Sequence, residues 1–183
     1  NVSRLEAGAT RIQPEPADLA AFIRETLKEL DSLAKERTCA LVFNEPSEHL
    51  GTLPIDTSLL SQVLLNLIEN AMRYSSKNAC CVTIKLEKKT GRGGYAIHLE
   101  DKGIGISHED RTRIFTKFFR ADNARKIQSD GSGLGLYVVK MIVEAWGGTI
   151  SFTSQPGMGT TFTVTIPASG MQPRKGIRQL IQI

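Results

Sequence analysis

The sequence lacks several features that would assign it to a protein class at once. Only three of its 183 residues are cysteines, Cys39, Cys80 and Cys81, and their spacing matches neither a CxxC pair nor a Cys/His metal site. No apolar run reaches the ~18 residues that a membrane-spanning helix needs, and the first residues show no signal-peptide pattern. The odd and partly adjacent cysteines predict a reduced, intracellular chain.

A strong charge of one sign is also lacking. The 23 Lys and Arg residues exceed the 19 Asp and Glu residues by only four. Aromatic residues make up 6% of the chain and do not alternate with the basic ones, which disfavours nucleic acid as a partner. This balance fits a polyphosphate ligand better. The length allows one ordinary domain, which can fold without a metal or a disulfide.

The two ends of the chain lack the regular pattern of helices and strands expected for its middle. The chain begins at Asn1 rather than Met, and residues 3–8 resemble the last turns of a helix closed by Gly8, so we expect a fragment of a longer protein. The tail from Ala168 to Ile183 is predicted to be disordered, with a docking or membrane-surface segment as the alternative.

Helices and hairpins alternate along the middle of the chain. Helical periodicity is expected over residues 18–37, 57–75, 108–115 and 133–146. Strands are expected near Ile12 and over residues 39–44, 79–88, 95–101, 149–154 and 160–167, the last four as two hairpins. Residues 116–132 are polar and aperiodic, which predicts a mobile loop. The fold class is α/β, a two-layer sandwich with a mixed, largely antiparallel sheet packed on three helices.

Polar side chains lie beside the apolar stripe of the helix at residues 57–75. Asn66, Asn70 and Arg73 fall three and four residues apart on one face. A buried amide without a partner costs about 1–3 kcal/mol, so these asparagines should meet a ligand unless they are merely surface residues. The amide oxygen of Asn70 suits Mg²⁺, and Tyr74 can pack on a base or ribose or simply in the core.

Glycine-rich stretches follow a strand and precede a helix. Asp101 stands at a strand end before Gly103 and Gly105, where a carboxylate can accept from a purine amine; a plain strand-end turn is the alternative. The run Asp130-Gly131-Ser132-Gly133-Leu134-Gly135-Leu136 opens a helix, where exposed N–H groups and the helix dipole favour a phosphate. Neither a GxxxxGK[ST] nor a GxGxxG motif is present. Arg120, between the two stretches, can reach a phosphate or form an ordinary surface ion pair.

Taken in order, these motifs resemble the boxes of sensor histidine kinases. Asn66 to Asn70 resembles the N box, Asp101-x-Gly103-x-Gly105 the G1 box and Phe115 to Arg120 the F box. Gly131-x-Gly133-x-Gly135 resembles the G2 box and Gly157-x-Gly159-Thr160 the G3 box. The resemblance covers residues 14–167 as the catalytic domain, and residues 1–13 resemble the end of the preceding dimerisation helix with its linker.

The resemblance implies a Bergerat-type fold shared with gyrase, Hsp90 and MutL, with ATP under a flexible lid at residues 116–132. It implies that Asp101 binds the adenine amine, that Thr160 supports it through water and that Asn70 holds Mg²⁺. Asn66, Asn70 and Arg120 are the implied catalytic residues, and Arg73 stands where the family often has lysine. The full set of implied cofactor-binding residues is Asn66, Asn70, Arg73, Tyr74, Asp101, Gly103, Gly105, Ile106, Arg120, Gly131, Gly133, Leu134, Gly135, Leu136 and Thr160.

The resemblance further implies phosphoryl transfer to a histidine. The related hydrolases carry a glutamate as general base where this chain has Asn66, and an amide cannot take that proton, so slow hydrolysis is expected. His49, His98 and His108 lie outside a helical hairpin, so the phosphoacceptor is expected on a dimerisation domain absent from the sequence. A response regulator, a homodimeric parent anchored in the inner membrane and a cytoplasmic location for this domain are implied. The alternatives are a non-catalytic nucleotide-sensing module and a hydrolase.

Overall fold

The computed structural model describes residues 12–75, 80–89, 93–128 and 130–172. Its elements are β1 (Glu15–Asp18), α2 (Leu19–Glu29), α3 (Asp31–Glu36), β2 (Cys39–Asn44), β3 (Thr52–Ile55), α4 (Thr57–Tyr74), β4 (Cys80–Lys88), β5 (Tyr95–Asp101), α5 (Asp122–Ile127), α6 (Gly135–Ala145), β6 (Ile150–Gln155) and β7 (Gly159–Ile166). Among these, no helix combines the length and apolarity needed to cross a bilayer.

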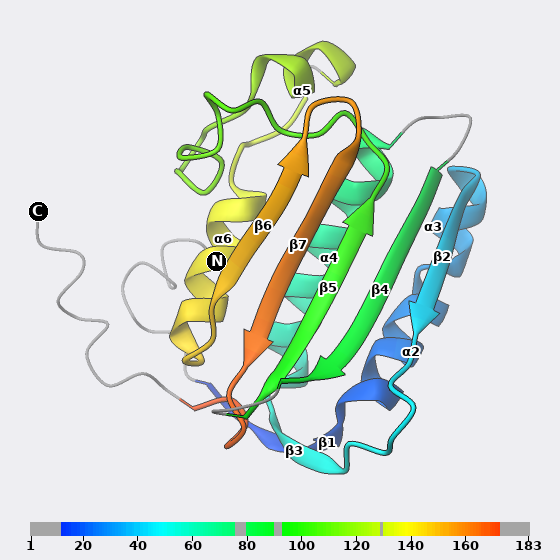
Figure 1. Ribbon diagram of the computed structural model, residues 1–183, viewed down its shortest axis with the longest axis vertical. Coiled ribbons are helices and arrows are strands. Elements are labelled where there is room, and N and C mark those ends of the chain that lie inside the picture. The colour runs from blue at the N-terminus through cyan, green and yellow to red at the C-terminus, as the bar shows by residue number, and fades with distance from the viewer. Residues whose placement is uncertain (1–11, 76–79, 90–92, 129, 173–183) are drawn as a thin grey trace, which may run out of the picture.

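One five-stranded sheet and the helices on one of its faces form the two layers. The strand order is β2-β4-β5-β7-β6, with β2 parallel to β4 and every other pair antiparallel. Helices α2, α4 and α6 lie behind the sheet in Figure 1, and no helix of the described residues covers its front face. The predicted fold class, a mixed and largely antiparallel sheet on three helices, is confirmed.

Helix α4 is fixed by its N-cap and by its apolar stripe. The Asp56 carboxylate accepts from the backbone N–H of Leu59 at 3.0 Å and from that of Gln13 at 2.8 Å. The stripe predicted from the sequence is buried, with Val63, Leu64, Leu67, Ile68 and Ala71 each 3% exposed or less. Because this stripe is buried, the opposite, polar face of α4 is held in one orientation.

The N-terminal part of the sandwich departs from the prediction. Ile12 is buried but is not in a strand. The first strand, β1, begins at Glu15 and pairs with β3. The sequence analysis did not predict β3. Pro16 lies opposite Pro54 in this small sheet, where edge positions need no N–H donor. The helix predicted over residues 18–37 is interrupted at Leu30 and continues as α3.

The segments in and before the predicted lid also differ from the secondary structure expected from the sequence. Residues 108–115 form successive turns instead of an α-helix. Most of the backbone hydrogen bonds here span three residues, as from Arg113 N–H to Asp110 O at 2.9 Å and from Thr116 N–H to Arg113 O at 2.8 Å. The predicted loop 116–132 contains α5, a helix without buried residues and so without the apolar period that would predict it.

Part of the C-terminal tail packs on the domain. The predicted disorder is wrong for residues 168–172, because Met171 is fully buried and its N–H donates to Pro54 O at 2.8 Å. The Met171 sulfur also accepts from the Asp56 N–H at 3.3 Å, so this segment supports the start of α4. The remaining residues 173–183, like the helix end predicted at residues 3–8, lie outside the described residues.

The prediction of a fully reduced chain is wrong for two of the cysteines. Cys39 and Cys80 form a disulfide, and Cys81 is free. The two residues are register partners on the parallel strands β2 and β4, 41 positions apart in the chain. The sequence spacing does not reveal this pairing, because it depends on which strand lies beside β2.

Candidate active site

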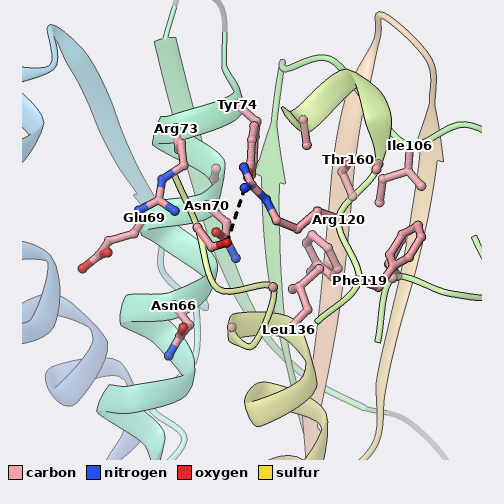
Figure 2. A pocket seen from close by; sticks show the side chains of 18 of the residues that line it. Asn66, Glu69, Asn70, Arg73, Tyr74, Ile106, Phe119, Arg120, Leu136 and Thr160 are labelled. Carbon is pink, nitrogen blue, oxygen red and sulfur yellow. Dashed lines mark hydrogen bonds between the residues drawn. The ribbon is translucent and has the colours of Figure 1, made fainter. Parts of the chain in front are cut away.

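A cleft of about 360 Å³ lies between α4, the start of α6, the loop after β5 and the segment that carries α5. This volume is within the usual range for a small-molecule site. Figure 2 shows that Asn66, Glu69, Asn70, Arg73 and Tyr74 project from α4, while Arg120 and Phe119 approach from the opposite side. Segments that are far apart in the sequence thus meet around one space.

The polar face of α4 forms one wall of the cleft. Asn66 Nδ2 donates to Gln62 O at 2.8 Å, one helical turn back, which leaves Oδ1 as the group turned outward. A Cβ on Gly135 would lie 3.1 Å from Asn66 Oδ1 and 3.7 Å from Asn70 Nδ2, so both amides lie beside the first residue of α6. Arg73 also lines this wall, and its Nε is buried without a hydrogen-bond partner within the described residues.

These groups fit a magnesium-bound polyphosphate. The amide oxygen of Asn70 is the kind of ligand that Mg²⁺ takes together with phosphate oxygens and water. Helix α6 begins at Gly135 without a side-chain cap at its N-cap residue, Leu134, so its first N–H groups and its dipole favour an anion. The orphaned Nε of Arg73 is a further donor for such an anion.

Asp101 is a buried acidic residue that lines the cleft. The residue is 7% exposed, and one carboxylate oxygen accepts from the Gly103 N–H at 2.8 Å. Burial raises the pKa of the Asp101 carboxyl from 3.8 to about 6, although hydrogen bonds from the Gly103 and Thr160 backbones lower it. A ligand that donates to the ionised carboxylate would stabilise the charge that burial disfavours.

Gly103 and Gly105 hold the loop after β5 close to its neighbours. A Cβ on Gly103 would lie 2.4 Å from Tyr74 O, and the N–H of Ile104 donates to that same carbonyl at 3.1 Å. Gly105, at φ +64°, approaches the Gln155 carbonyl so closely that a Cβ there would lie 2.0 Å from its oxygen. These contacts join the end of α4 to the turn between β6 and β7.

The segment predicted to form a lid contacts the glycine-rich loop that precedes α6. The Arg120 guanidinium donates to Gly131 O at 3.3 Å and to Gln128 O. Gly133, at φ +67°, lies against Phe118, whose backbone is itself at φ +64°. A Cβ on Gly133 would lie 2.7 Å from the Phe118 carbonyl carbon. The two segments are therefore interlocked at positions that few residue types can occupy.

The structure brings nearly all of the predicted site residues together. Every candidate nucleotide-binding residue lines the cleft except Gly103, which lies behind Asp101 and holds it. The sequence analysis did not single out several further lining residues, namely Gln62, Glu69, Ile104, Ile114, Phe119, Asn123, Val138 and Phe162. Asn123 Nδ2 donates to Gly105 O at 3.2 Å, a contact between α5 and the loop after β5 that the sequence does not signal.

Comparisons with known proteins identify the family to which these motifs belong. Residues 55–170 match the family described as histidine kinase-, DNA gyrase B-, and HSP90-like ATPase. The chain is 36% identical over 169 residues to the sensor-like histidine kinase SenX3 of Mycolicibacterium smegmatis, covering 91% of this chain and 42% of that protein. It is 30% identical over 173 residues to the sensor protein EvgS of Escherichia coli O157:H7, covering 94% of this chain and 14% of EvgS.

A solved structure shows the same fold. The crystal structure of full-length ShkA in complex with AMPPNP superposes with a TM-score of 0.77 at 26% identity, covering 94% of this chain and 34% of ShkA. This chain therefore spans less than half the length of each of these three proteins.

Proposed function

Because the chain belongs to the family of histidine kinase-, DNA gyrase B-, and HSP90-like ATPases, we propose that it binds Mg·ATP in this cleft as the catalytic domain of a sensor histidine kinase. It would transfer the γ-phosphoryl group to a histidine on a dimerisation domain, for relay to a response regulator. The parent is proposed to be a membrane-anchored homodimer with this domain in the cytoplasm. The names of the sensor-kinase relatives support this proposal.

One observation carries the proposal: a buried carboxylate, two amides and two arginines from separate segments line a single cleft beside the N-terminus of α6. Asp101 would accept from the adenine amine, and Asn70 would hold Mg²⁺. The bound metal would neutralise charge on the phosphates during transfer. Arg73 and Arg120 would donate to phosphate oxygens, and the lid would exclude water.

Water attack is not favoured by the groups present. In the proposed alignment Asn66 occupies the position where the related hydrolases have a glutamate, and its Nδ2 donates to Gln62 O at 2.8 Å. An amide cannot accept the proton of an attacking water. Glu69 does line the cleft, but in Figure 2 its side chain extends away from Asn70 and Arg120. Slow hydrolysis and efficient transfer are therefore expected from the same residues.

Two measurements test the proposal. Calorimetric titration with Mg²⁺ and a non-hydrolysable ATP analogue should show binding by the chain and a roughly tenfold to hundredfold loss in Asp101→Asn. Asn70→Ala should lose mainly the dependence on Mg²⁺, and Ser151→Ala, an exposed change on β6, serves as the control. A folded chain that binds no nucleotide contradicts the proposal.

Under this proposal, kinase activity requires a phosphoacceptor histidine on a dimerisation domain. The chain incubated with labelled ATP should not label itself, but it should label the histidine of a purified dimerisation domain from the parent protein. Nucleotide binding without any such label would favour the non-catalytic sensing module instead. Brisk release of inorganic phosphate by the chain alone would favour a hydrolase.

A further inference from the structure

Three side chains lie in a row across three neighbouring strands at the floor of the cleft. Asp101 on β5 is the register partner of Thr160 on β7, and Thr160 is the register partner of Ser154 on β6. All three are buried, with exposed fractions of 7%, 6% and 8%. Asp101 and Thr160 line the cleft, whereas Ser154 lies behind Thr160.

The Ser154 hydroxyl makes three short polar contacts but has only one proton to donate. It accepts from the Ile106 N–H at 2.8 Å, donates to Gly159 O at 2.9 Å, and lies 2.9 Å from Thr160 Oγ1. A carbonyl oxygen can only accept, so the proton of Ser154 belongs to the contact with Gly159. The contact between the two hydroxyls then requires the proton of Thr160, which must point at Ser154.

This arrangement decides what Thr160 offers to a ligand. With its proton directed at Ser154, Thr160 Oγ1 has only lone pairs left for the cleft. The ionised Asp101 carboxylate beside it is also an acceptor. The two side chains therefore present acceptors only, which suits a group with two N–H donors or a water that donates to both. A ring carbonyl at the same place would meet lone pairs.

From this geometry we propose that Ser154 is a positioning residue for base selection, which acts through Thr160 to favour a 6-amino purine over a 6-oxo purine. The inference deepens the proposed function and rests on it. Ser154 touches no ligand itself; it fixes the direction of one hydroxyl proton. Arg111 supports this role, because its Nη2 donates to the Ser154 carbonyl and holds the strand in place.

The test compares two nucleotides across the wild type, three variants and one control variant. Calorimetry with Mg²⁺ measures the affinities of non-hydrolysable ATP and GTP analogues for the wild type, Ser154→Ala, Thr160→Val and the double variant. In Ser154→Ala the Thr160 hydroxyl is free to rotate and donate, so the preference for the ATP analogue should fall about tenfold. In the Thr160→Val background the Ser154→Ala change should leave the preference unaltered. Ser151→Ala, an exposed serine on the same strand, should match the wild type.

Other results overturn the inference. A purely structural role would lower both affinities by the same factor and leave their ratio unchanged. A change of ratio that persists in the Thr160→Val background would mean that Ser154 does not act through Thr160. If Ser154→Ala fails to fold, the nearly isosteric Thr160→Val alone decides: it should weaken the ATP analogue without weakening the GTP analogue, and equal losses refute the argument.

The wild type separates this inference from the proposed function. A wild-type chain that binds both analogues equally well contradicts base selection while the nucleotide site stands. A folded wild-type chain that binds neither analogue contradicts both.

Discussion

Replacing Asp101 by asparagine should stabilise the fold while it weakens nucleotide binding. Asp101 is 7% exposed, and burial raises the pKa of its carboxyl from 3.8 to about 6. The folded chain therefore holds this proton more tightly than the unfolded chain does. The stability associated with the protonated group is complete below about pH 4, and it is lost as the pH rises to about 6. At neutral pH the wild type carries a buried charge that the amide removes.

The pKa shift sets the size of the effect. A difference of about two pKa units corresponds to about 3 kcal/mol. The asparagine oxygen can still accept from the Gly103 N–H, but its amide N–H groups need partners in a buried place. We therefore expect the variant to gain about 1–3 kcal/mol of unfolding free energy at pH 7.5, with the gain vanishing near pH 4.

Urea unfolding at several pH values between 4 and 7.5 tests this expectation. The fluorescence of Trp146 reports unfolding, because this single tryptophan is fully buried in the folded chain. Glu100→Gln removes a carboxylate at the exposed neighbouring position and should show no comparable gain. An Asp101→Asn variant that is less stable than the wild type at pH 7.5, or whose stability difference does not change with pH, refutes the reasoning.

Three further predictions concern the lid, the phosphates and the disulfide. Gly133→Ala should weaken ATP-analogue binding more than Gly157→Ala, because both glycines have positive φ but only Gly133 places a new Cβ 2.7 Å from the lid backbone; equal effects in calorimetry would contradict the steric argument. Arg120→Ala should weaken the ATP analogue by about 1 kcal/mol, roughly fivefold, and ADP hardly at all if the guanidinium contacts the terminal phosphate; an equal loss for both nucleotides would count against that contact. Cys39→Ser should lower the unfolding free energy by about 2–4 kcal/mol in non-reducing urea titrations, because it opens a disulfide that joins positions 41 apart; Cys81→Ser is the control, and equal stability of both variants would speak against the bond.

The elements predicted with the right type are those whose residues bury a regular stripe. The prediction is confirmed for helix α4 and for the paired strands β4–β5 and β6–β7, because the apolar period and the neighbouring glycines agree there. The sequence analysis missed β3 and α5. Within the described part of the chain, β3 contains Pro54 and pairs only with β1, and α5 buries no side chain, so neither carries a periodic signal.

The disulfide and the packed tail illustrate a second limit. Cys39 meets Cys80 only because β2 lies parallel to β4, and a local pattern does not specify such a long-range neighbour. Met171 is buried because Gly170, at φ +80°, lets the chain pass against Pro54, where a Cβ would lie 2.4 Å from the carbonyl oxygen. Neither contact follows from composition.

The candidate site was more predictable than the fold around it. Asn66, Asn70, Asp101 and the glycines stand out because their types conflict with their local setting, as amides beside a core stripe or glycines at a helix start. The residues that the sequence did not signal, such as Asn123 and Ser154, act through partners on other elements. Their hydrogen bonds span 18 residues for Asn123 and up to 48 residues for Ser154.

Similar conflicts gather around the cleft that we propose as the nucleotide site. The described structure leaves Arg73 Nε buried without a partner, keeps Asp101 buried at a raised pKa, and starts α6 without a side-chain cap. A buried polar group without a partner is costly, and Arg73, Asp101 and the first residue of α6 all line one cleft of about 360 Å³. A single ligand that carries a donor at one end and several anionic oxygens at the other would relieve them together. A purine nucleoside triphosphate has this chemistry, so under the proposed function its binding would offset these costs and stabilise the folded chain.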